Sequence, residues 1–227
     1  MKNIVIVGAS RGIGKELVKQ LSANHNVLAF SRNKERLLAL SKETGAKVQD
    51  IDLTSELFKT EFTESITNHF KTVDVLINNA GYLVNKPFLE TTLEDIKKTF
   101  ETNVFGLIQS SQAIIPFMES NGGHIVNIGS IGGVQGSVKF PGIGVYSSSK
   151  AAVTGYTECL AEELKETNIQ VNSLALGAVQ TEMLAEAFPG YEAPTSPEEM
   201  AEFIANFSLN SNKWMHGKII PVSKSTP

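Results

Sequence analysis

Short apolar runs alternate with amphipathic stretches along the whole chain of 227 residues. Strands are expected at 3–8, 26–30, 46–50, 73–78, 124–128, 169–176 and 217–222. Helices are expected to begin near Gly12, Lys34, Ser55, Thr92, Tyr146 and Pro197. Strands and helices that take turns this regularly build a parallel sheet covered on both faces. The sequence therefore predicts one doubly wound α/β domain over residues 1–227, with a mostly parallel, seven-stranded sheet.

The charge balance argues against nucleic acid and membranes as partners. The formal net charge is −4 and the basic residues are scattered rather than clustered. The N-terminal run in MKNIVIVGAS is too short for a signal-peptide core, and no later segment reaches a transmembrane length. We expect a cytoplasmic protein with no nucleic-acid or membrane partner.

Cysteine and histidine usage points away from disulfides and metals. The single cysteine, Cys159, cannot form an internal disulfide, which fits a reducing compartment. Its apolar helical surroundings predict a small buried core residue. The four histidines, His25, His69, His124 and His216, lie far apart without ligand spacing, so no metal site is expected.

The first expected strand runs directly into GASRGIG, residues 8–14, and then into a helix. Glycines allow a tight turn and close approach of the backbone to a ligand. The free N–H groups at the start of a helix favour a pyrophosphate. This order of strand, loop and helix predicts nucleotide binding, with a merely structural turn as the alternative.

A second motif, YSSSK, places Tyr146 and Lys150 four residues apart, and YLVNK repeats that spacing with Tyr82 and Lys86. Pro87 disfavours a helical conformation at Lys86, so the first pair is not expected to share a helix face. The second pair runs into an amphipathic pattern and should lie side by side on the first turn of a helix. A lysine ammonium there would lower the pKa of the tyrosine, and it would make the phenol a usable acid and base.

These motifs occur in an order that resembles the short-chain dehydrogenase/reductase family. The Gly-x-x-x-Gly-x-Gly loop is followed by DLT at 52–54, NNAG at 78–81, Asn103 in an expected long helix, Ser130 in IGSIGG, YSSSK, and LGAVQT at 176–181. The resemblance covers nearly the whole chain and implies a Rossmann-type fold. The chain departs from the family pattern in Leu176, where a proline usually precedes Gly177, and in a longer spacing between Ser130 and Tyr146.

The resemblance assigns catalytic roles to four residues. Tyr146 would be the acid and base, and Lys150 would also bind the nicotinamide ribose. Ser130 would steady the substrate oxygen, and Asn103 would hold a structural water of a proton relay. From the residues alone, Ser130 could equally be a turn serine, and Asn103 a surface amide or a local helix kink.

The end of the second strand favours NADP(H) over NAD(H) as the cofactor. An acidic residue there would bind the ribose 2′-OH of NAD, whereas arginine pairs with the 2′-phosphate of NADP. This chain has Ser31 and Arg32 at that place and no acid. Arg11, inside the glycine loop, matches a basic residue of NADP-using family members. The alternative is that either arginine is a solvated surface charge.

The resemblance also implies the remaining cofactor contacts. Asp52 would bind the adenine amino group, unless it only caps a helix, and Leu53 would pack beside the ring. Asn78 is instead interpreted as a structural amide that holds the adjacent chain. The expected cofactor-binding residues are Gly8, Ser10, Arg11, Gly12, Ile13, Gly14, Ser31, Arg32, Asp52, Leu53, Asn79, Ala80, Gly81, Tyr146, Lys150, Gly177, Val179 and Thr181.

Together these features predict an enzyme that transfers a hydride between NADP(H) and a carbonyl or secondary alcohol. The alternative is a non-catalytic NADP(H)-binding sensor or scaffold, which would not need Tyr146 and Lys150. Segments 134–145 and 182–195 show no clear element and are expected to form the walls of the substrate site. The resemblance implies a homodimer or homotetramer, with the helices after Thr92 and Tyr146 as interfaces. The candidate pocket residues are largely apolar and favour a compact hydrophobic carbonyl compound: Val134, Phe140, Met183, Leu184, Phe188 and Tyr191.

Overall fold

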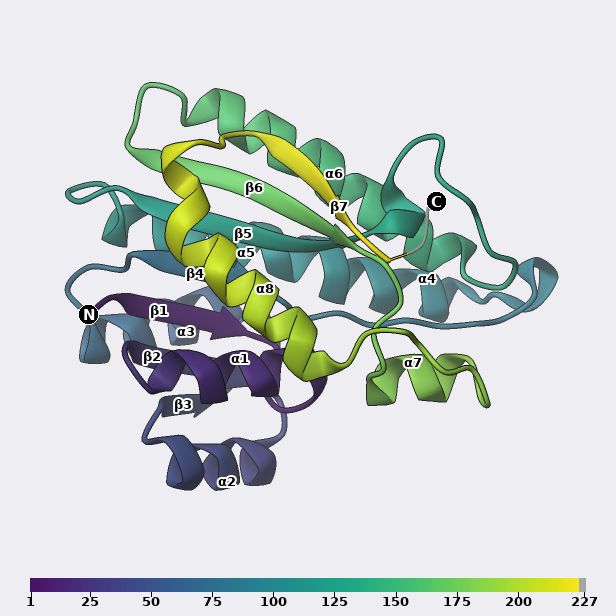
Figure 1. Ribbon diagram of the computed structural model, residues 1–227, viewed down its shortest axis with the longest axis horizontal. Coiled ribbons are helices and arrows are strands. Elements are labelled where there is room, and N and C mark those ends of the chain that lie inside the picture. The colour runs from purple at the N-terminus through teal and green to yellow at the C-terminus, as the bar shows by residue number, and fades with distance from the viewer. Residues whose placement is uncertain (225–227) are drawn as a thin grey trace.

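The computed structural model describes residues 1–224. Its seven strands form one parallel sheet in the order β3-β2-β1-β4-β5-β6-β7 (Figure 1). The strand order reverses between β1 and β4, which is the topological switch point of a doubly wound sheet. The predicted fold class is confirmed. The strands are β1 Asn3–Val7, β2 Asn26–Ser31, β3 Lys47–Asp50, β4 Val75–Asn78, β5 Gly123–Ser130, β6 Ile169–Leu176 and β7 Lys218–Val222.

All six expected helices are present, and the third begins at Phe58 rather than near Ser55. Ser196 and Glu199 form the capping box that their spacing predicts, because each side chain bonds the backbone N–H of the other. The helices are α1 Gly12–Ser22, α2 Lys34–Thr44, α3 Phe58–His69, α4 Leu93–Phe100, α5 Gly106–Ile114, α6 Gly144–Glu163, α7 Glu182–Ala187 and α8 Pro197–Asn210. Short 3-10 turns lie at Phe88–Glu90, Ile115–Phe117, Ile131–Gly133 and Ser211–Lys213, and a π-helical turn at Glu101–Phe105.

The short helix α7 corrects the expectation that segment 182–195 has no regular element. Thr181 caps it, because its hydroxyl accepts a hydrogen bond from the backbone N–H of Leu184 at 3.3 Å. Six residues are too few to show a helical period of hydrophobic residues, so the pattern alone could not reveal it.

The core has two halves, one on each face of the sheet. Along β1, Ile4 and Ile6 pack toward α1, α2 and α8, whereas Val5 and Val7 face α3, α5 and α6. Figure 1 shows α1, α2 and α8 on the near face of the sheet, with α4, α5 and α6 behind it. Strands buried on both faces explain the nearly continuous apolar runs in the sequence.

Cys159 is exposed, so its predicted place in the core is wrong. The buried stripe of α6 contains Val153, Thr157 and Leu160, which are spaced by one helical turn. Cys159 precedes Leu160 by a single residue, and this turns its side chain about 100° away from the stripe.

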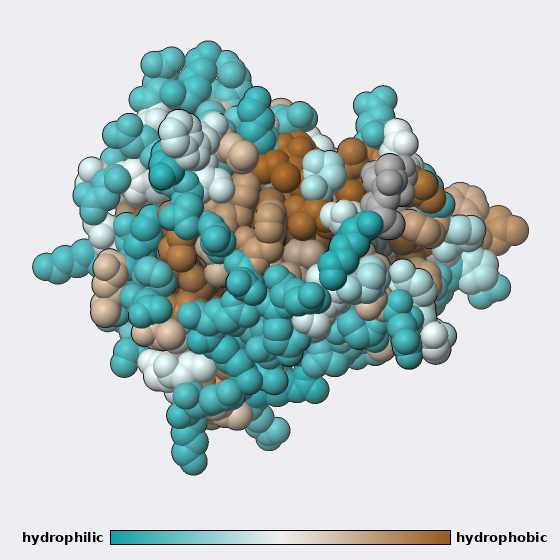
Figure 2. All heavy atoms as spheres, in the orientation of Figure 1, coloured by the Kyte–Doolittle hydropathy of each residue, from teal (hydrophilic) through white to brown (hydrophobic). Residues whose placement is uncertain are grey.

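Much of the surface in Figure 2 is hydrophilic, but hydrophobic residues gather across the middle of this face, where Figure 1 shows β6, β7 and α8. Within residues 1–224, no helix combines the length and the hydropathy that crossing a bilayer requires. The same residues contain no cluster of three or more His, Cys, Asp or Glu arranged to hold a metal.

Candidate active site

A cleft of about 650 Å³ opens at the carboxyl ends of the strands, where the strand order reverses. Ser130, Tyr146 and Lys150 line it. Every expected cofactor-binding residue lines it as well, except Gly14. Motifs that are far apart along the chain therefore line one cleft in the folded protein.

The glycine loop fits a pyrophosphate by its geometry. Gly8 has a φ of 89°, and a Cβ there would lie only 2.5 Å from the backbone of Ala80. Gly14 lies behind the loop, where a Cβ would collide with the carbonyl oxygen of Gly8. Asn79 donates its side-chain N–H to that same oxygen at 2.8 Å. No side chain caps the start of α1, so the first N–H groups of the helix remain available to an anion.

Three polar residues of the cleft lining, Ser10, Ser31 and Asp52, are held by hydrogen bonds. Ser31 donates to the hydroxyl of Ser10 at 2.7 Å, which joins the tip of β2 to the glycine loop. Asp52 accepts from the backbone N–H and the hydroxyl of Thr54 through one oxygen, Oδ1, at 2.9 Å each. Its carboxylate thus shapes a turn before α3, although it also faces the cleft.

Arg11 and Arg32, the expected 2′-phosphate ligands, line the same cleft. Arg32 is exposed at the end of β2. Arg11 is engaged by a carboxylate that the sequence did not reveal: its guanidinium donates to Glu186 at 2.5 and 3.2 Å.

Lys150 lines the cleft but is buried, with only 3% of its surface exposed. Its ammonium donates to the carbonyl oxygen of Ile128 at 2.8 Å and lies 5.8 Å from the centre of the Tyr146 ring. Burial lowers the pKa of Lys150 from its ordinary value of 10.5 to about 8. The two side chains meet because residues 144–163 are helical, which brings positions i and i+4 together.

The pKa of Tyr146 moves opposite to the predicted direction. Burial raises it above its ordinary value, and a hydrogen bond with the Ser130 side chain offsets only part of that effect. The helical spacing was foreseeable, but the depth of burial was not. In this structure Tyr146 is therefore a neutral phenol at pH 7, which is the form that donates a proton.

Asn103 lies in the π-helical turn between α4 and α5 and is completely buried. Its side-chain N–H group donates to the carbonyl of Tyr82 and to the hydroxyl of Ser149, both at 2.9 Å. Its oxygen accepts from the N–H of Tyr82 at 2.6 Å. Asn103 does not line the cleft, but a Cβ on Gly81 would lie 3.8 Å from both its oxygen and the Lys150 ammonium. The irregular helix turns this amide toward the site.

Asn78 shows the contacts of a structural amide. It donates to Asn127 at 2.9 Å and to Ser111 at 3.2 Å, and it accepts from Ser110 at 2.7 Å. All four residues are buried. These contacts join β4, β5 and α5 beneath the cleft and agree with the interpretation of Asn78 as a support for the neighbouring chain.

The lining of the cleft as a whole is largely apolar. Of the six candidate pocket residues, five line it; Val134 does not. The backbone N–H of Val134 closes the 3-10 turn on Ile131 at 3.0 Å, which places Val134 just past that turn. Val138 and Ile143 also line the cleft and belong to segment 134–145, which the sequence predicts as a wall, whereas Leu83 had no recognisable sequence signal.

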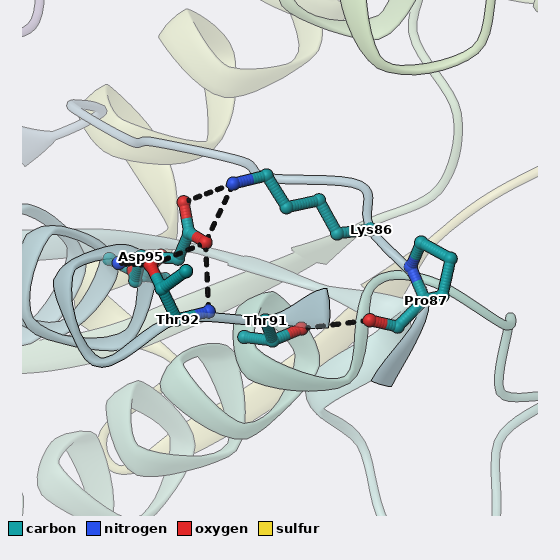
Figure 3. A network of polar contacts seen from close by, with 6 residues as sticks. Lys86, Pro87, Thr91, Thr92 and Asp95 are labelled. Carbon is teal, nitrogen blue, oxygen red and sulfur yellow. Dashed lines mark hydrogen bonds and ion pairs between the residues drawn. The ribbon is translucent and has the colours of Figure 1, made fainter. Parts of the chain in front are cut away.

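The first Tyr-x-x-x-Lys segment lies in irregular chain before α4, as Pro87 predicts. Its Lys86 reaches the start of α4 and donates to both carboxylate oxygens of Asp95, at 2.7 and 2.9 Å (Figure 3). Asp95 also accepts from the backbone N–H and the hydroxyl of Thr92 in a capping box. This lysine therefore anchors a loop.

Comparison with known proteins gives the family. The profile of the family described as short chain dehydrogenase matches residues 2–192. Carbonyl reductase family member 4 of Xenopus tropicalis is 36% identical over 185 residues, which cover 80% of this chain and 77% of that protein. NADP-dependent 3-hydroxy acid dehydrogenase YdfG of Salmonella typhi is 33% identical over 217 residues, which cover 88% of this chain and 86% of that protein.

The fold matches a solved structure as well. A crystal structure named ribose-5-phosphate isomerase, from Brucella melitensis 16M, superposes with a TM-score of 0.88 and 26% identity. The match covers 97% of this chain and 90% of that one. With the family profile matching most of its length, the chain belongs to the short chain dehydrogenase family of oxidoreductases.

Proposed function

We propose that this protein is an NADP(H)-dependent enzyme that interconverts a neutral, largely apolar carbonyl compound and the corresponding secondary alcohol. One observation carries the proposal. The phenol of Tyr146 and the buried ammonium of Lys150 face the same cleft one helical turn apart, next to Ser130. A reducible carbonyl needs a proton donor and a hydrogen bond to its oxygen at such a place.

The residues of the cleft fit NADP(H). The uncapped start of α1 and the open backbone at Gly8 suit a pyrophosphate. Arg11 and Arg32 suit the 2′-phosphate, as the name of one relative, NADP-dependent 3-hydroxy acid dehydrogenase, also suggests. Gly177, Val179 and Thr181 would hold the nicotinamide end, and the bound cofactor would supply the hydride.

The chain's own residues manage the proton. In the direction of reduction, the hydroxyl of Ser130 binds the substrate oxygen, and the phenolic O–H of Tyr146 gives its proton to that oxygen as negative charge develops there. Tyr146 is suited to this direction because its raised pKa keeps it protonated at pH 7. Lys150, with a pKa of about 8, is mostly charged at pH 7 and stabilises the resulting phenolate. Asn103 acts as a positioning residue for the chain around Gly81.

The apolar walls define the substrate class. Leu83, Phe140, Met183, Leu184 and Phe188 line the same cleft as the reacting groups. Among the described lining residues, the cations are Arg11, Arg32 and Lys150, all assigned above to the cofactor or to catalysis. A substrate carboxylate would therefore be desolvated without a dedicated partner. Neutral apolar carbonyl compounds should react faster than 3-oxo acids of the same length.

The wider organisation belongs to the same proposal. Residues 1–227 act as a single catalytic domain, with segments 134–145 and 182–195 as substrate walls, in a cytoplasmic homodimer or homotetramer. Phe88, Leu89 and Leu93 are highly exposed around the start of α4 and would be covered in an oligomer. Light scattering measures the oligomeric state directly. A monomer at micromolar concentration would rule the oligomer out.

The test compares Tyr146→Phe with Tyr82→Phe, which alters the other Tyr-x-x-x-Lys segment. NADPH oxidation is followed by absorbance with a panel of neutral aldehydes and ketones, and NADPH binding by fluorescence titration. Tyr146→Phe should lower kcat by about 10²–10⁴-fold, the range for general acid catalysis, with little change in the Kd of NADPH. Tyr82→Phe should retain parental turnover. A parent protein that binds NADPH and reduces no carbonyl would instead favour the sensor or scaffold.

A further inference from the structure

The guanidinium of Arg11 is already occupied in this structure. Both of its terminal nitrogens donate to Glu186, one to each carboxylate oxygen, at 2.5 and 3.2 Å. This is the two-pronged arrangement that arginine forms with carboxylates and phosphates. The two residues are 175 positions apart in sequence, and both side chains are partly exposed.

Glu186 belongs to α7, which covers part of the cleft. Met183 and Leu184 of this helix line the cleft, and Figure 1 shows α7 set apart from the other helices beyond the end of the sheet. The helix is capped locally at its start and held to a distant segment at its end. Thr181 caps its start, and Asn85 donates to the carbonyl of Ala187 at 2.8 Å. Within residues 1–224, the Arg11–Glu186 ion pair is the salt bridge that links α7 to the glycine loop.

A 2′-phosphate and the Glu186 carboxylate would compete for the same donors. Each presents oxygens to a planar guanidinium, and a phosphate monoester carries more negative charge at pH 7 than a carboxylate. If both anions stayed beside Arg11, they would repel each other at close range. Arg36 on α2 adds to the positive potential here. The hydrogen bond from Arg11 is the main cause of the lowered pKa of Glu186, and the charge of Arg36 is a smaller one.

We propose that Glu186 is a specificity-determining residue whose carboxylate holds Arg11 in the free protein and is replaced by the 2′-phosphate of NADP(H). This inference rests on the proposed function. Exchange of the carboxylate for the phosphate would release α7 from the glycine loop only when the phosphorylated cofactor binds. NAD(H) carries a hydroxyl at that position, so the Arg11–Glu186 pair would persist and α7 would stay fastened.

The size of the effect follows from the exposure of the pair. Ion pairs between partly exposed side chains are weak, so removing the competing carboxylate should tighten binding of a 2′-phosphate by about 2–5-fold. The gain should shrink as salt is added, because salt screens exposed charges. Ligands without a 2′-phosphate should gain nothing.

The experiment uses two nucleotides that differ only at the 2′ position. Both lack the nicotinamide half of the cofactor, so neither should bury α7 directly and alter its hydrogen exchange by contact. Adenosine 2′,5′-bisphosphate and adenosine 5′-monophosphate are titrated by calorimetry into the parent protein, Glu186→Gln and Glu192→Gln. Glu192 is the matched control, because it is an exposed acid shortly after α7 and forms no ion pair within residues 1–224. Only Glu186→Gln should bind the bisphosphate more tightly, and the monophosphate should bind all three proteins equally.

A double-mutant cycle assigns the effect to Arg11. On an Arg11→Met background, Glu186→Gln should no longer change the affinity for the bisphosphate. Hydrogen exchange provides a readout of α7 itself. The bisphosphate should speed amide exchange in residues 182–187 of the parent, whereas the monophosphate should not. Glu186→Gln should exchange fast without any ligand.

Several results would overturn the inference. Glu186→Gln and Glu192→Gln could bind both nucleotides alike, or Glu186→Gln could tighten the monophosphate as much as the bisphosphate. In either case Glu186 would have no specific role, while NADPH binding by the parent would leave the proposed function standing. A parent that binds neither NADPH nor the bisphosphate would instead refute the proposed cofactor, and the inference with it.

Discussion

Two segments of this chain share the spacing Tyr-x-x-x-Lys but differ in local structure, in the burial of the lysine and in the direction of its pKa change. Tyr82 and Lys86 lie in irregular chain, where Lys86 is 41% exposed at its side chain and paired with Asp95. The hydrogen bond to Asp95 is the main cause of the raised pKa of Lys86. Tyr146 and Lys150 lie on α6, where Lys150 is buried against the carbonyl of Ile128 and its pKa is lowered to about 8.

The Tyr-x-x-x-Lys spacing becomes a candidate site only where the lysine is buried without a carboxylate partner. A lysine that is neutralised by a carboxylate has little field left for a neighbour, whereas Lys150 keeps an uncompensated charge. At 1.36 kcal/mol per pKa unit, lowering the pKa from 10.5 to about 8 opposes folding by about 3 kcal/mol. Because the folded pKa lies below the unfolded one, this cost is fully present below pH 8 and is relieved as the pH rises toward 10.5. A chain that retains such a charge in its cleft suggests a use for it there.

The largest expected effect comes from Lys150→Met, which removes the charge and keeps most of the volume. Turnover should fall by at least about 10²-fold, because nothing then stabilises the phenolate of Tyr146. The free energy of unfolding at pH 7 should stay the same or rise by up to about 3 kcal/mol, since a buried charge has gone. Steady-state kinetics and urea unfolding measure the two effects. A Lys150→Met protein with parental turnover would contradict the comparison.

The pH dependence of reduction should report Lys150 rather than Tyr146. The pKa of Tyr146 is raised, so the phenol stays protonated through neutral and mildly alkaline pH. Lys150 loses its proton near pH 8, so kcat/KM for carbonyl reduction should be flat below pH 8 and fall by roughly tenfold per unit well above it. A pH profile of the parent checks this. If Lys86 governed the profile instead, Lys86→Met would abolish the fall.

A second buried base, His124, tests whether burial alone marks a site. It is 1% exposed, and Nδ1–H donates to the carbonyl of Ser208 at 3.0 Å. Nε2 must therefore accept from the amide of Asn172 at 2.9 Å, and that amide cannot flip because its oxygen accepts from the N–H of Lys218. Every polar atom of the neutral ring is satisfied, so we expect no catalytic use of it.

This arrangement makes stability, and not activity, depend on the protonation of His124. Burial lowers its pKa from 6.5 to about 4, so the unfolded chain binds the proton more readily. Stability should be lost as the pH falls below 6.5, by about 2 kcal/mol between pH 7 and pH 5 from this residue. Urea unfolding of the parent and of His124→Asn at pH 7 and pH 5 measures how much of the loss in stability comes from His124. Turnover of His124→Asn at pH 7 should match the parent, and a loss comparable to that of Lys150→Met would refute the distinction.

The sequence predicts the sheet well because each strand is buried on both faces and each helix has its own boundary signals. Ser196, Pro197 and Glu199 are one example of such a signal. The predictions fail where an element is too short to show a hydrophobic period, or where a shift of one residue along a helix moves a side chain from the buried to the exposed face. The helix α7 has only six residues, and Cys159 lies one position from the buried stripe of its helix. In neither case does the hydrophobic periodicity of the sequence suffice to predict the structure.

In the candidate site as well, features that are local in sequence could be predicted, whereas features that depend on the tertiary fold could not. The glycine loop and the Tyr146–Lys150 pair are local, so spacing alone could place them together. The direction of the pKa change of Tyr146 depends on how deeply the fold buries it, and spacing carries no such information. Glu186 meets Arg11 across 175 positions, and the polar contacts of Asn103 reach Tyr82 and Ser149. Such contacts exist only once the fold has formed.

The smallest expected effect comes from Lys86→Met, which breaks the ion pair and leaves the capping box of Thr92 and Asp95 in place. Lys86 is 41% exposed at its side chain, so solvent screens the pair and Tm should fall by no more than a few degrees. Turnover should not change, because Lys86 lies outside the cleft lining.

Asp95→Asn removes the ion pair and also weakens the capping box, so it should lower Tm further than Lys86→Met. The pKa of Asp95 is lowered to about 2, chiefly by its hydrogen bond with Lys86, so its contribution is present above pH 4 and lost only as the pH approaches 2. Calorimetry and kinetics on both variants complete the comparison, and a Lys86→Met protein with impaired turnover would show that the spacing matters even without a helix.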